Sequence, residues 1–370
     1  MTIIKRYIEK QVISDLKEKM VFISGPRQVG KTTFAKSLIK DKRSYLNWDY
    51  YEHREMILKN QLPLVDFIVF DEIHKYKGWS NFIKGVYDVY KEKKKIIVTG
   101  SGRLDIIRRG GDSLQGRYHM IRFLPLTLNE IKADNEKDFI EFLELSPFPE
   151  PFFSSSKQKS DRWTKEYRER LVYDEINTIE KINDISKLEL LMIRLPELVG
   201  SPLSLNSLVN DIGVSHKTVA RWINVIEMMF GIFRIRPFGI NILRAVKKEQ
   251  KHYHYDYNLI KENSFRFENF VALHLYKWVC FEQDKGNDID LRYIKDVEGR
   301  EIDFVIVKEK KPITFVECKW SDVDISNNLK YIKKRFPDSQ CYQIYAHGKK
   351  EYEKDRICLM PAYRFLKRFI

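Results

Sequence analysis

The sequence predicts an α/β protein with three domains, two of which contain a β-sheet. The chain has 370 residues, which is more than one hydrophobic core usually accommodates. From Met20 to about Thr127, short apolar runs alternate with stretches of helical periodicity. This alternation is typical of a parallel sheet with helices on both faces. A second alternation of apolar runs and helices occupies the C-terminal part of the chain, after a region whose pattern is helical.

The predicted domains follow these changes of pattern. We expect an α/β domain at residues 1–143, a linker at 144–165, a winged-helix domain at 166–240 and a second α/β domain at 241–370. The linker is predicted from the text LSPFPEPFFSSSKQKSD, in which prolines and a run of serines disfavour a packed element. A surface loop is the other interpretation of this segment.

The composition limits the class of protein and its partners. The hydrophobic content of 43% and the charged content of 32% are typical of a globular chain, and the net charge of +14 favours a polyanionic partner such as nucleic acid. The four cysteines form no CxxC pair, so reduced thiols are expected rather than zinc or disulfides. Residues 1–20 predict a charged amphipathic helix, and no apolar run approaches the roughly 20 residues of a membrane span. We therefore expect a cytoplasmic protein.

A glycine-rich loop in the first domain carries the strongest functional signal. GPRQVGKT, Gly25–Thr32, follows the apolar run MVFIS and begins a helix. In this setting backbone N–H groups surround phosphates, Lys31 reaches the β- and γ-phosphates, and the Thr32 hydroxyl ligates Mg²⁺. Binding of ATP or GTP with Mg²⁺ is therefore predicted. The residues expected at the nucleotide are Gly25, Pro26, Arg27, Gln28, Val29, Gly30, Lys31, Thr32, Thr33, Asp71 and Ser101.

Two carboxylates at the end of another apolar run extend this site. In FIVFDE, Phe67–Glu72, Asp71 is expected to hold the magnesium through water and Glu72 to orient the attacking water. A DE pair alone is often only a solvated turn, but the preceding P-loop favours the catalytic interpretation. The run KIIVTGS brings Thr99 and Ser101 to the same sheet edge, either as γ-phosphate sensors or as an ordinary Gly-Ser turn.

Arg117 in SLQGRY is a candidate arginine finger that would complete the site of a neighbouring subunit, which implies a homo-oligomer. GPRQVGKTT, VFDEIH, TGSGRL and SLQGRYHMIRFLPLTLNEI resemble the AAA-type P-loop domain of an archaeal and bacterial ATPase family whose members end in a nuclease-like domain. The resemblance continues through FPEPFF and RFENFVALHL. It implies an ATPase that assembles into a ring, for example a hexamer, and that uses adenine nucleotides.

The helical region resembles a winged helix. PLSLNSLVNDIGVSHKTVARWINVIEMM contains two helices joined by a turn at Gly213, with Ser215 as the N-cap of the second helix, and GIFRIRPFG follows as a β-ribbon. His216, Lys217 and Arg221 lie on the predicted exposed face of the second helix and are candidate DNA contacts. The alternative is a packing module with an ordinary solvated basic face.

The C-terminal region carries charges at positions that otherwise appear buried. In GREIDFVIV, Glu301 and Asp303 share one strand face, and in FVECKW, Glu317 and Lys319 share one face. In the preceding helix, SFRFENFVALHLYKWVCF, Glu268 falls on the apolar stripe that is expected to pack on the sheet. A buried glutamate is costly unless it is paired or bound to a metal. We therefore expect these acids to converge.

A helix Glu, a strand Asp and a Glu-x-Lys on the next strand resemble the PD-(D/E)XK nuclease fold, in an arrangement similar to that of archaeal Holliday junction resolvases. The resemblance implies that Asp303 and Glu317 bind one or two divalent ions, Mg²⁺ or Mn²⁺, and that Glu268 completes the shell. Lys319 would help to activate water and to stabilise the phosphate. Ile302 stands where the motif nominally has proline. The alternatives are a structural salt bridge of Lys319 with the acids and a nuclease fold without activity.

Two functional hypotheses follow from these motifs. The leading hypothesis is an oligomeric AAA-type ATPase that binds and remodels DNA, with branched DNA as the expected form, and that carries a metal-dependent endonuclease site. The alternative is a nucleotide-switched DNA- or protein-binding regulator whose nuclease-like domain is an inactive scaffold. Glu72 and the complete set of acids favour the first hypothesis.

Overall fold

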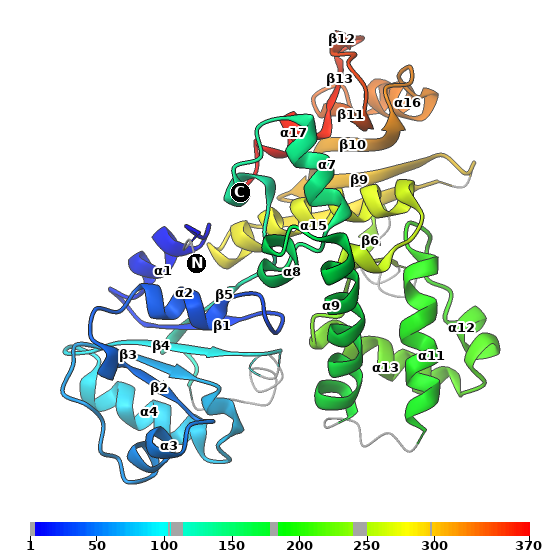
Figure 1. Cartoon of the computed structure of the whole chain (residues 1–370). Helices are drawn as coiled ribbons and strands as arrows, with labels where there is room; N and C mark the ends of the chain where they lie inside the picture. The colour runs from blue at the N-terminus through cyan, green and yellow to red at the C-terminus, as the bar shows by residue number, and fades with distance from the viewer. Residues whose placement is uncertain (1–3, 103, 105–113, 178–183, 240–249, 297) are drawn as a thin grey trace. The chain divides into compact units, whose positions relative to one another are not determined.

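The structure, a computed structural model, describes residues 4–102, 104, 114–177, 184–239, 250–296 and 298–370 (Figure 1). The chain divides into two compact units, Met1–Pro125 and Leu126–Ile370. The predicted boundary at residue 143 falls inside the second unit, which also contains both the predicted helical domain and the C-terminal α/β domain. The predicted start of the last domain, residue 241, lies outside the described residues. Among the helices of the described ranges, none combines the length and apolar character needed to cross a membrane.

The first unit is built on a parallel sheet, as the sequence predicts. Its described strands occur in the order β2-β3-β4-β1-β5, and every neighbouring pair is parallel. The elements in chain order are α1 (Glu9–Asp15), β1 (Met20–Ser24), α2 (Lys31–Ser37), η1 (Lys42–Ser44), β2 (Tyr45–Asn47), α3 (Tyr51–Leu58), β3 (Phe67–Asp71), η2 (Ile73–Lys75), α4 (Trp79–Tyr90), β4 (Lys95–Gly100) and β5 (Tyr118–Arg122).

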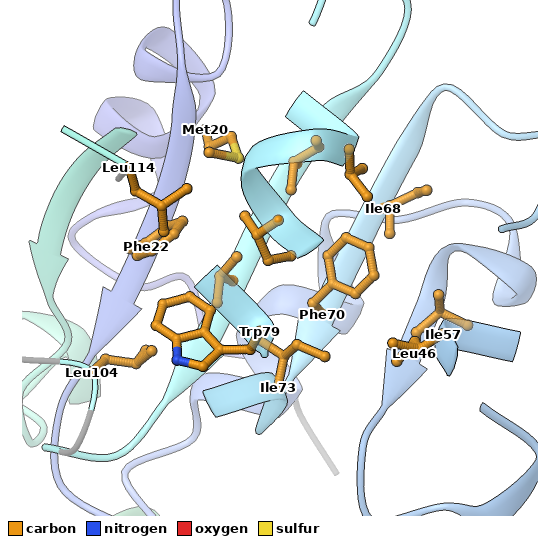
Figure 2. Packing of buried hydrophobic residues seen from close by; sticks show 14 residues of the cluster. Met20, Phe22, Leu46, Ile57, Ile68, Phe70, Ile73, Trp79, Leu104 and Leu114 are labelled. Carbon is orange, nitrogen blue, oxygen red and sulfur yellow. The ribbon is translucent and has the colours of Figure 1, made fainter. Parts of the chain in front are cut away.

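Apolar side chains cover both faces of this sheet. Figure 2 shows one face, where Phe22 and Phe70 of the strands lie in one buried cluster with Trp79 of α4. Val21 and Ile23 alternate with Phe22 along β1 and are also fully buried, so they face the opposite layer. With both faces covered, polar loops gather where the parallel strands end, which is where ligands bind in such sheets.

The N-terminal helix is shorter than the sequence predicts. α1 covers only Glu9–Asp15, and residues 4–8 before it are not helical. The side chains of Arg6 and Tyr7 instead reach the residues at the end of β5. The Arg6 guanidinium lies 3.9 Å from the centre of the Phe123 ring, and Tyr7 OH donates a hydrogen bond to the carbonyl oxygen of Arg122. These tertiary contacts fix residues that a helix would otherwise contain.

The second unit begins with helices and ends in a mixed sheet. Its helical elements are α6 (Leu128–Ile131), α7 (Glu136–Glu144), α8 (Pro149–Phe153), α9 (Lys157–Arg170), η3 (Leu171–Ile176), α11 (Ile185–Arg194), η4 (Leu195–Leu198), α12 (Leu205–Ile212), α13 (His216–Met228), η5 (Tyr257–Leu259), α15 (Asn263–Asp284), α16 (Asn327–Arg335) and α17 (Ala362–Leu366). Its strands are β6 (Ile232–Pro237), β7 (Lys251–His254), β8 (Ile289–Lys295), β9 (Glu301–Lys308), β10 (Lys311–Ser321), β11 (Gln340–His347), β12 (Tyr352–Lys354) and β13 (Ile357–Pro361).

The segment predicted as a linker, residues 144–165, is packed and largely helical. Phe148 is fully buried, and its ring lies 4.9 Å from that of Trp163 and 5.0 Å from that of Tyr167. Pro149 occupies the start of α8, where a proline costs no helical hydrogen bond, and Ser156 caps α9. The prolines and serines therefore mark the starts of helices, and the aromatic side chains supply the burial that the linker interpretation overlooked.

The predicted helix-turn-helix is present as α12 and α13. Gly213 ends α12 with a φ of 70°, the left-handed conformation expected of the turn glycine. Ser215 caps α13, because its side chain accepts a hydrogen bond from the backbone N–H of Thr218. β6 and β7 then pair antiparallel, as a ribbon after the two helices would.

The sheet of the second unit orders its described strands as β12-β13-β11-β10-β9-β8-β6-β7. β8, β9 and β10 form an antiparallel meander, and β11 pairs parallel with β10. α15 precedes this meander and packs on β7, β8 and β10, whereas α16 connects β10 to β11 and packs on β9, β11 and β13. The order α15-β8-β9-β10-α16-β11 brings the three charge-bearing elements, α15, β9 and β10, into one layered structure.

Candidate functional sites

The P-loop connects β1 to α2 and folds around its own lysine. Lys31 Nζ donates hydrogen bonds to the carbonyl oxygens of Gly25 at 2.9 Å and Pro26 at 2.6 Å. Gln28 and Gly30 have positive φ values of 59° and 98°, which turn the backbone into a compact loop. A Cβ at Gly25 would lie 2.1 Å from the carbonyl oxygen of Phe123, so two backbones approach here too closely for any side chain.

Asp71 ends β3 at the carboxyl edge of the sheet, where three hydroxyl groups donate to it. Thr32 Oγ1 and Tyr45 OH donate to Oδ2 at 2.8 and 2.6 Å, and Thr99 Oγ1 donates to Oδ1. These donors are neutral, so they orient the carboxylate without compensating its charge. Burial and the hydrogen bond to Asp71 raise the pKa of Tyr45, which keeps the phenol a donor. Sequence reasoning overlooked Tyr45, and Thr99 contacts Asp71 in a role that the sensor hypothesis did not anticipate.

Glu72 adopts a left-handed conformation with a φ of 56°, which is uncommon for a residue other than glycine and often marks a functional site. In this conformation its backbone N–H donates to the carbonyl oxygen of Thr99 at 3.0 Å. Its Oε2 lies 3.5 Å from Lys75 Nζ and 3.7 Å from His74 Nε2. Burial raises the pKa of Glu72, and the charges of Lys75 and Lys31 oppose this shift. A carboxylate with these properties is suited to the predicted water-orienting role.

Ser101 lies at the same edge of the sheet. Gly100, the residue before it, pairs with Ser24, the residue before the P-loop. The Ser101 hydroxyl is buried and has no hydrogen-bond partner within the described ranges. An unpaired buried hydroxyl is costly, so this position is compatible with a ligand contact.

Arg6 contacts the P-loop, a contact that sequence reasoning missed. Its guanidinium donates to the carbonyl oxygen of Val29 at 2.9 Å and to that of Leu124 at 2.6 Å, and the side chain is buried. Arg6 thereby connects the P-loop to the segment that follows β5 through hydrogen bonds. Nothing local marks this residue, because it is one of several charged residues in the N-terminal stretch.

Arg117, the candidate arginine finger, lies at the opposite edge of the sheet from its own P-loop. Its carbonyl oxygen accepts a hydrogen bond from the N–H of Met20, the first residue of β1, whereas Gly25 follows the last. A five-residue strand separates these edges by about 17 Å. The guanidinium pairs with Asp88 of α4 at 2.7 and 3.1 Å, which raises the pKa of Arg117. In this arrangement the Arg117 guanidinium is held at Asp88, away from the P-loop of its own chain.

In the second unit, side-chain hydrogen bonds connect α15 to β7 at the charged cluster. The fully buried Asn269 side chain donates to the carbonyl oxygen of His254 at 2.8 Å and accepts from its N–H at 2.7 Å. Glu268, the neighbouring residue on α15, accepts a hydrogen bond from Tyr253 OH at 2.7 Å. The strand that precedes α15 is thus held in register with the glutamate that the sequence singled out.

Lys251 at the start of β7 is the main feature of this cluster that sequence reasoning missed. Its Nζ lies 2.5 Å from Glu301, 3.4 Å from Glu268 and 4.0 Å from Asp303. Burial alone would lower the pKa of Lys251, but these three carboxylates outweigh burial and raise it. A signal was present, because alternation along KHYH places Lys251 and Tyr253 on one strand face and the two histidines on the other.

The histidines of β7 take no part in this cluster. His252 Nε2 lies 2.8 Å from the carbonyl oxygen of Leu195, and both rings are fully buried. Burial lowers the pKa of His252 to about 4 and that of His254 to about 3, so both are neutral at physiological pH. Both lie along the strand β7.

The predicted strand residues converge at β9 and β10. Asp303 Oδ2 accepts a hydrogen bond from the backbone N–H of Cys318 at 2.7 Å, and Lys319 Nζ donates to Glu317 Oε1 at 2.8 Å. Burial raises the pKa of Asp303, and the neighbouring charges of Glu268 and Glu317 raise it further. Burial also raises the pKa of Glu317, against the effect of Lys319. The Lys319–Glu317 pair that the sequence allowed as a structural alternative is thus present.

A cavity of about 300 Å³ opens beside these groups. Aromatic, acidic and basic side chains line it together, so it is suited to a ligand with both charged and flat parts. The lining residues are Ser264, Phe265, Phe267, Glu268, Asp303, Cys318, Lys319 and Trp320.

The fit of a divalent cation to the predicted ligands is uneven. Glu317 Oε2 is buried and has no hydrogen-bond partner in the described part of the chain, which suits an oxygen that a cation can satisfy. Glu268, in contrast, already has Tyr253 and Lys251 at its Oε1. Within the described ranges, no group of three or more His, Cys, Asp and Glu side chains is arranged to hold a metal ion. Glu317 Oε2 is thus compatible with a cation contact, whereas Glu268 as arranged does not complete the predicted shell.

His216, Lys217 and Arg221 lie on the exposed face of α13, as predicted, while Val219 and Trp222 of the same helix are buried. This arrangement leaves basic side chains at the surface beside the ribbon of β6 and β7. It is compatible with nucleic-acid binding and equally with a solvated helix face.

The first unit has the parallel sheet, the glycine-rich loop and the edge carboxylates of a P-loop nucleotide-binding domain. Comparison with known families agrees, since residues 17–132 match the family model described as an AAA domain. This match supports an AAA-type ATPase domain, a class that uses nucleotide and usually Mg²⁺. The two models that follow are both described as domains of unknown function, DUF8612 over residues 136–262 and DUF4143 over residues 264–365.

One relative is an uncharacterised protein of Methanocaldococcus jannaschii. It is 23% identical over 305 residues, which cover 67% of this chain and 63% of the relative. The matched region thus spans less than two thirds of the relative's length. The middle and last family models meet at residues 262 and 264, so β7 and Lys251 belong to the middle model, whereas the predicted last domain began at residue 241.

Proposed function

We propose that this protein is an oligomeric, Mg²⁺-dependent ATPase that acts on DNA and whose second unit carries a PD-(D/E)XK-like site for phosphodiester cleavage. The observation that carries the second half of this proposal is the convergence of Glu268, Asp303 and the Glu317–Lys319 pair beside one cavity, from elements in the order α15-β8-β9-β10-α16-β11. A helix acid, a strand acid and an acid-lysine pair on the next strand are the groups that this chemistry uses.

The ATPase half is supported by the P-loop site. Lys31 would exchange the carbonyls of Gly25 and Pro26 for phosphate oxygens, and Thr32 and Asp71 would hold Mg²⁺. Held there, Mg²⁺ would supply positive charge that offsets the negative charge developing on the phosphates during transfer. Glu72 would orient the attacking water and accept its proton. Adenine remains the expected base from the family resemblance.

The cleavage half assigns a role to each group of the cluster. Asp303 and Glu317 would hold a divalent ion, which lowers the pKa of a bound water when present. Lys319 is about one third exposed and lines the cavity, so its ammonium can contact a phosphate oxygen. Water attack would form one P–O bond while the bond to the leaving sugar oxygen breaks.

DNA is the proposed substrate because the net charge is +14 and basic side chains of α13 are exposed. His216, Lys217 and Arg221 are the proposed contacts. Arg117, distant from its own P-loop, would act in a neighbouring subunit of a ring.

A panel of DNA substrates tests the cleavage half. Linear, forked and four-way DNA are incubated with Mg²⁺ or Mn²⁺, with and without ATP. Wild type should cleave at least one of them, and Asp303→Asn and Lys319→Met should each reduce the rate by about 100-fold or more. Lys354→Met, which changes an exposed lysine of β12, is the matched control and should cleave normally. Absence of cleavage by wild type on every substrate would refute this half and leave the ATPase half standing.

The regulator hypothesis stays as a second candidate because Lys251 already lies among Glu268, Glu301 and Asp303. In this case the second unit would be a scaffold, and DNA or protein binding would depend on the nucleotide. DNA affinity of Glu72→Gln with ATP, compared with ADP, tests it. Nucleotide-dependent binding without cleavage would favour the regulator.

A further inference from the structure

Lys251 is a positive charge in the place where the cluster would otherwise need a cation. We infer that its ammonium group is the permanent counter-ion of Glu268, Glu301 and Asp303, and that it limits the cluster to one divalent ion, held at Asp303 and Glu317. The limit to one ion rests on the proposed metal site; the counter-ion role rests on the contacts alone.

The contacts of Lys251 support the first part. Its side chain is about 1% exposed, and Nζ lies 2.5, 3.4 and 4.0 Å from Glu301, Glu268 and Asp303 respectively. A buried ammonium that reaches three carboxylates fulfils the charge role of a bound cation without being exchangeable.

The chain around Lys251 holds it in place. Gln250, the preceding residue, accepts a hydrogen bond from the N–H of Leu203 at 2.9 Å, and Lys251 itself pairs with Ile235 of β6. Two residues further along, Tyr253 donates to Glu268, and Asn269 binds the backbone of His254. Movement of Lys251 away from the acids would require β7 to leave both β6 and α15.

The position of Lys251 decides where a divalent ion can bind. An ion shared by Glu268 and Asp303 would lie against the ammonium group, and the repulsion between the two charges is strong in a buried site. Glu317 pairs with a different ammonium group, that of Lys319. Its Oε2 is buried without a hydrogen-bond partner in the described ranges. One ion at Asp303 and Glu317 is therefore compatible with Lys251, and a second ion at Glu268 is not.

The charges of the cluster lead to the same expectation. Glu268, Glu301, Asp303 and Glu317 provide four carboxylates, against the ammonium groups of Lys251, Lys295 and Lys319. Loss of Lys251 would increase the negative charge at Glu268 and Asp303 and free the space between them. A divalent ion should then bind where the lysine was.

Manganese binding by the full chain without nucleotide tests the inference. Mn²⁺ bound per chain is counted by equilibrium dialysis for wild type, Lys251→Met and the matched control Lys295→Met, which removes an exposed lysine from the same Glu301. Lys251→Met should bind one additional Mn²⁺, or bind it at least about tenfold more tightly, which corresponds to about 1.4 kcal/mol. Adding Asp303→Asn to each variant identifies the ions that belong to this cluster. Equal Mn²⁺ binding by wild type and Lys251→Met would overturn the inference.

A second variant keeps the test valid if Lys251→Met does not fold. Lys251→Met combined with Glu301→Gln removes one positive and one negative charge and still leaves Glu268 and Asp303 without the lysine. The melting temperature of this double variant should rise on addition of Mn²⁺ by more than that of wild type. An equal rise would also overturn the inference.

The result of the Mn²⁺-binding test can be distinguished from the result of the DNA-cleavage test. If no variant cuts DNA but Lys251→Met gains Mn²⁺, the cleavage proposal fails and the counter-ion role of Lys251 stands. If wild type cuts DNA and Lys251→Met gains no Mn²⁺, the cleavage proposal stands and the inference about Lys251 fails.

Discussion

In the P-loop site, Lys31 donates to backbone carbonyls and Asp71 accepts from hydroxyl groups, whereas in the cluster of the second unit Lys251 and Lys319 donate to carboxylates. The first arrangement orients charged groups with neutral partners, so their charges stay available to a charged ligand. In the second, opposite charges already face one another. A lysine of the first kind should therefore matter for function and little for stability, and Lys251 should matter for stability as well.

The largest effect is expected at Lys31, and it concerns the rate of ATP hydrolysis rather than the stability of the fold. Lys31→Ala should reduce ATP hydrolysis by about 10³-fold, because it removes the charge that stabilises the transferring phosphate. The melting temperature should stay close to that of wild type, since the lost partners are carbonyl groups. Phosphate release and thermal unfolding measured on one preparation check both statements. A large loss of stability would contradict the proposed distinction.

Glu72→Gln should reduce ATP hydrolysis by about 100-fold while ATP binding persists, because the amide cannot accept the proton of water. The wild-type pH profile gives a second readout. Since burial raises the pKa of Glu72, the active, ionised form is lost as pH falls, at a higher pH than for an ordinary glutamate. The variant should lack this acidic limb. Exposed Glu92→Gln is the control, and an unchanged profile in Glu72→Gln would exclude Glu72 as the base.

Gly25→Ala tests whether close backbone packing holds the P-loop. The added Cβ would lie 2.1 Å from the Phe123 carbonyl oxygen, so we expect the first unit to be destabilised by about 2 kcal/mol. Gly85→Ala in α4 is the control, because its added Cβ meets no atom within 4 Å and should stabilise the helix by about 0.5–1 kcal/mol. Denaturant unfolding measures both. Equal effects of the two substitutions would contradict the packing argument.

Arg6→Met should weaken ATP binding by about tenfold, because it removes a charged hydrogen bond to the Val29 carbonyl of the P-loop. Calorimetric titration with ATP measures the effect. Arg43→Met is the matched control, since Arg43 pairs with Asp41 at the surface and should leave the affinity unchanged. Should both variants bind ATP like wild type, Arg6 does not position the loop.

The smallest effect is expected at Asp303, and it tests how a buried charge in the cluster of the second unit affects stability. Since burial and nearby acids raise its pKa, its ionised form costs stability at neutral pH. Asp303→Asn should therefore stabilise the second unit at pH 7. The folded state of wild type binds the proton more tightly, so this advantage should shrink as pH falls through the raised pKa. Exposed Asp324→Asn should show no such trend in chemical unfolding.

The strand-loop-helix setting of the contiguous motifs agrees with the prediction from the sequence. GPRQVGKT and FIVFDE place their functional groups within a few positions of a strand end, where one local conformation fixes them. The exposed face of α13 also agrees with prediction, because periodicity depends only on nearby residues. The linker predicted at residues 144–165 was wrong as an unpacked segment, because Phe148 packs against Trp163 inside the segment and against Tyr167 just after it.

The partners that orient the sites were not predictable. Tyr45 and Arg6 reach Asp71 and the P-loop from distant positions, and neither has a local signature. The alternation along β7 indicated the strand face of Lys251 but not its partners. Lys251 lies among the acids because β7 pairs with β6 and is hydrogen-bonded to α15.

By itself, the sequence determined the parallel sheet with its P-loop, the helix-turn-helix and the acids that had to converge, because periodicity and motif spacing are local properties. The tertiary structure decided which charges meet. Whether Glu317 finds Lys319 or a cation, and whether Glu268 faces a metal or Lys251, depends on contacts between residues far apart in the chain, and the free energy of a buried charge is set by those neighbours.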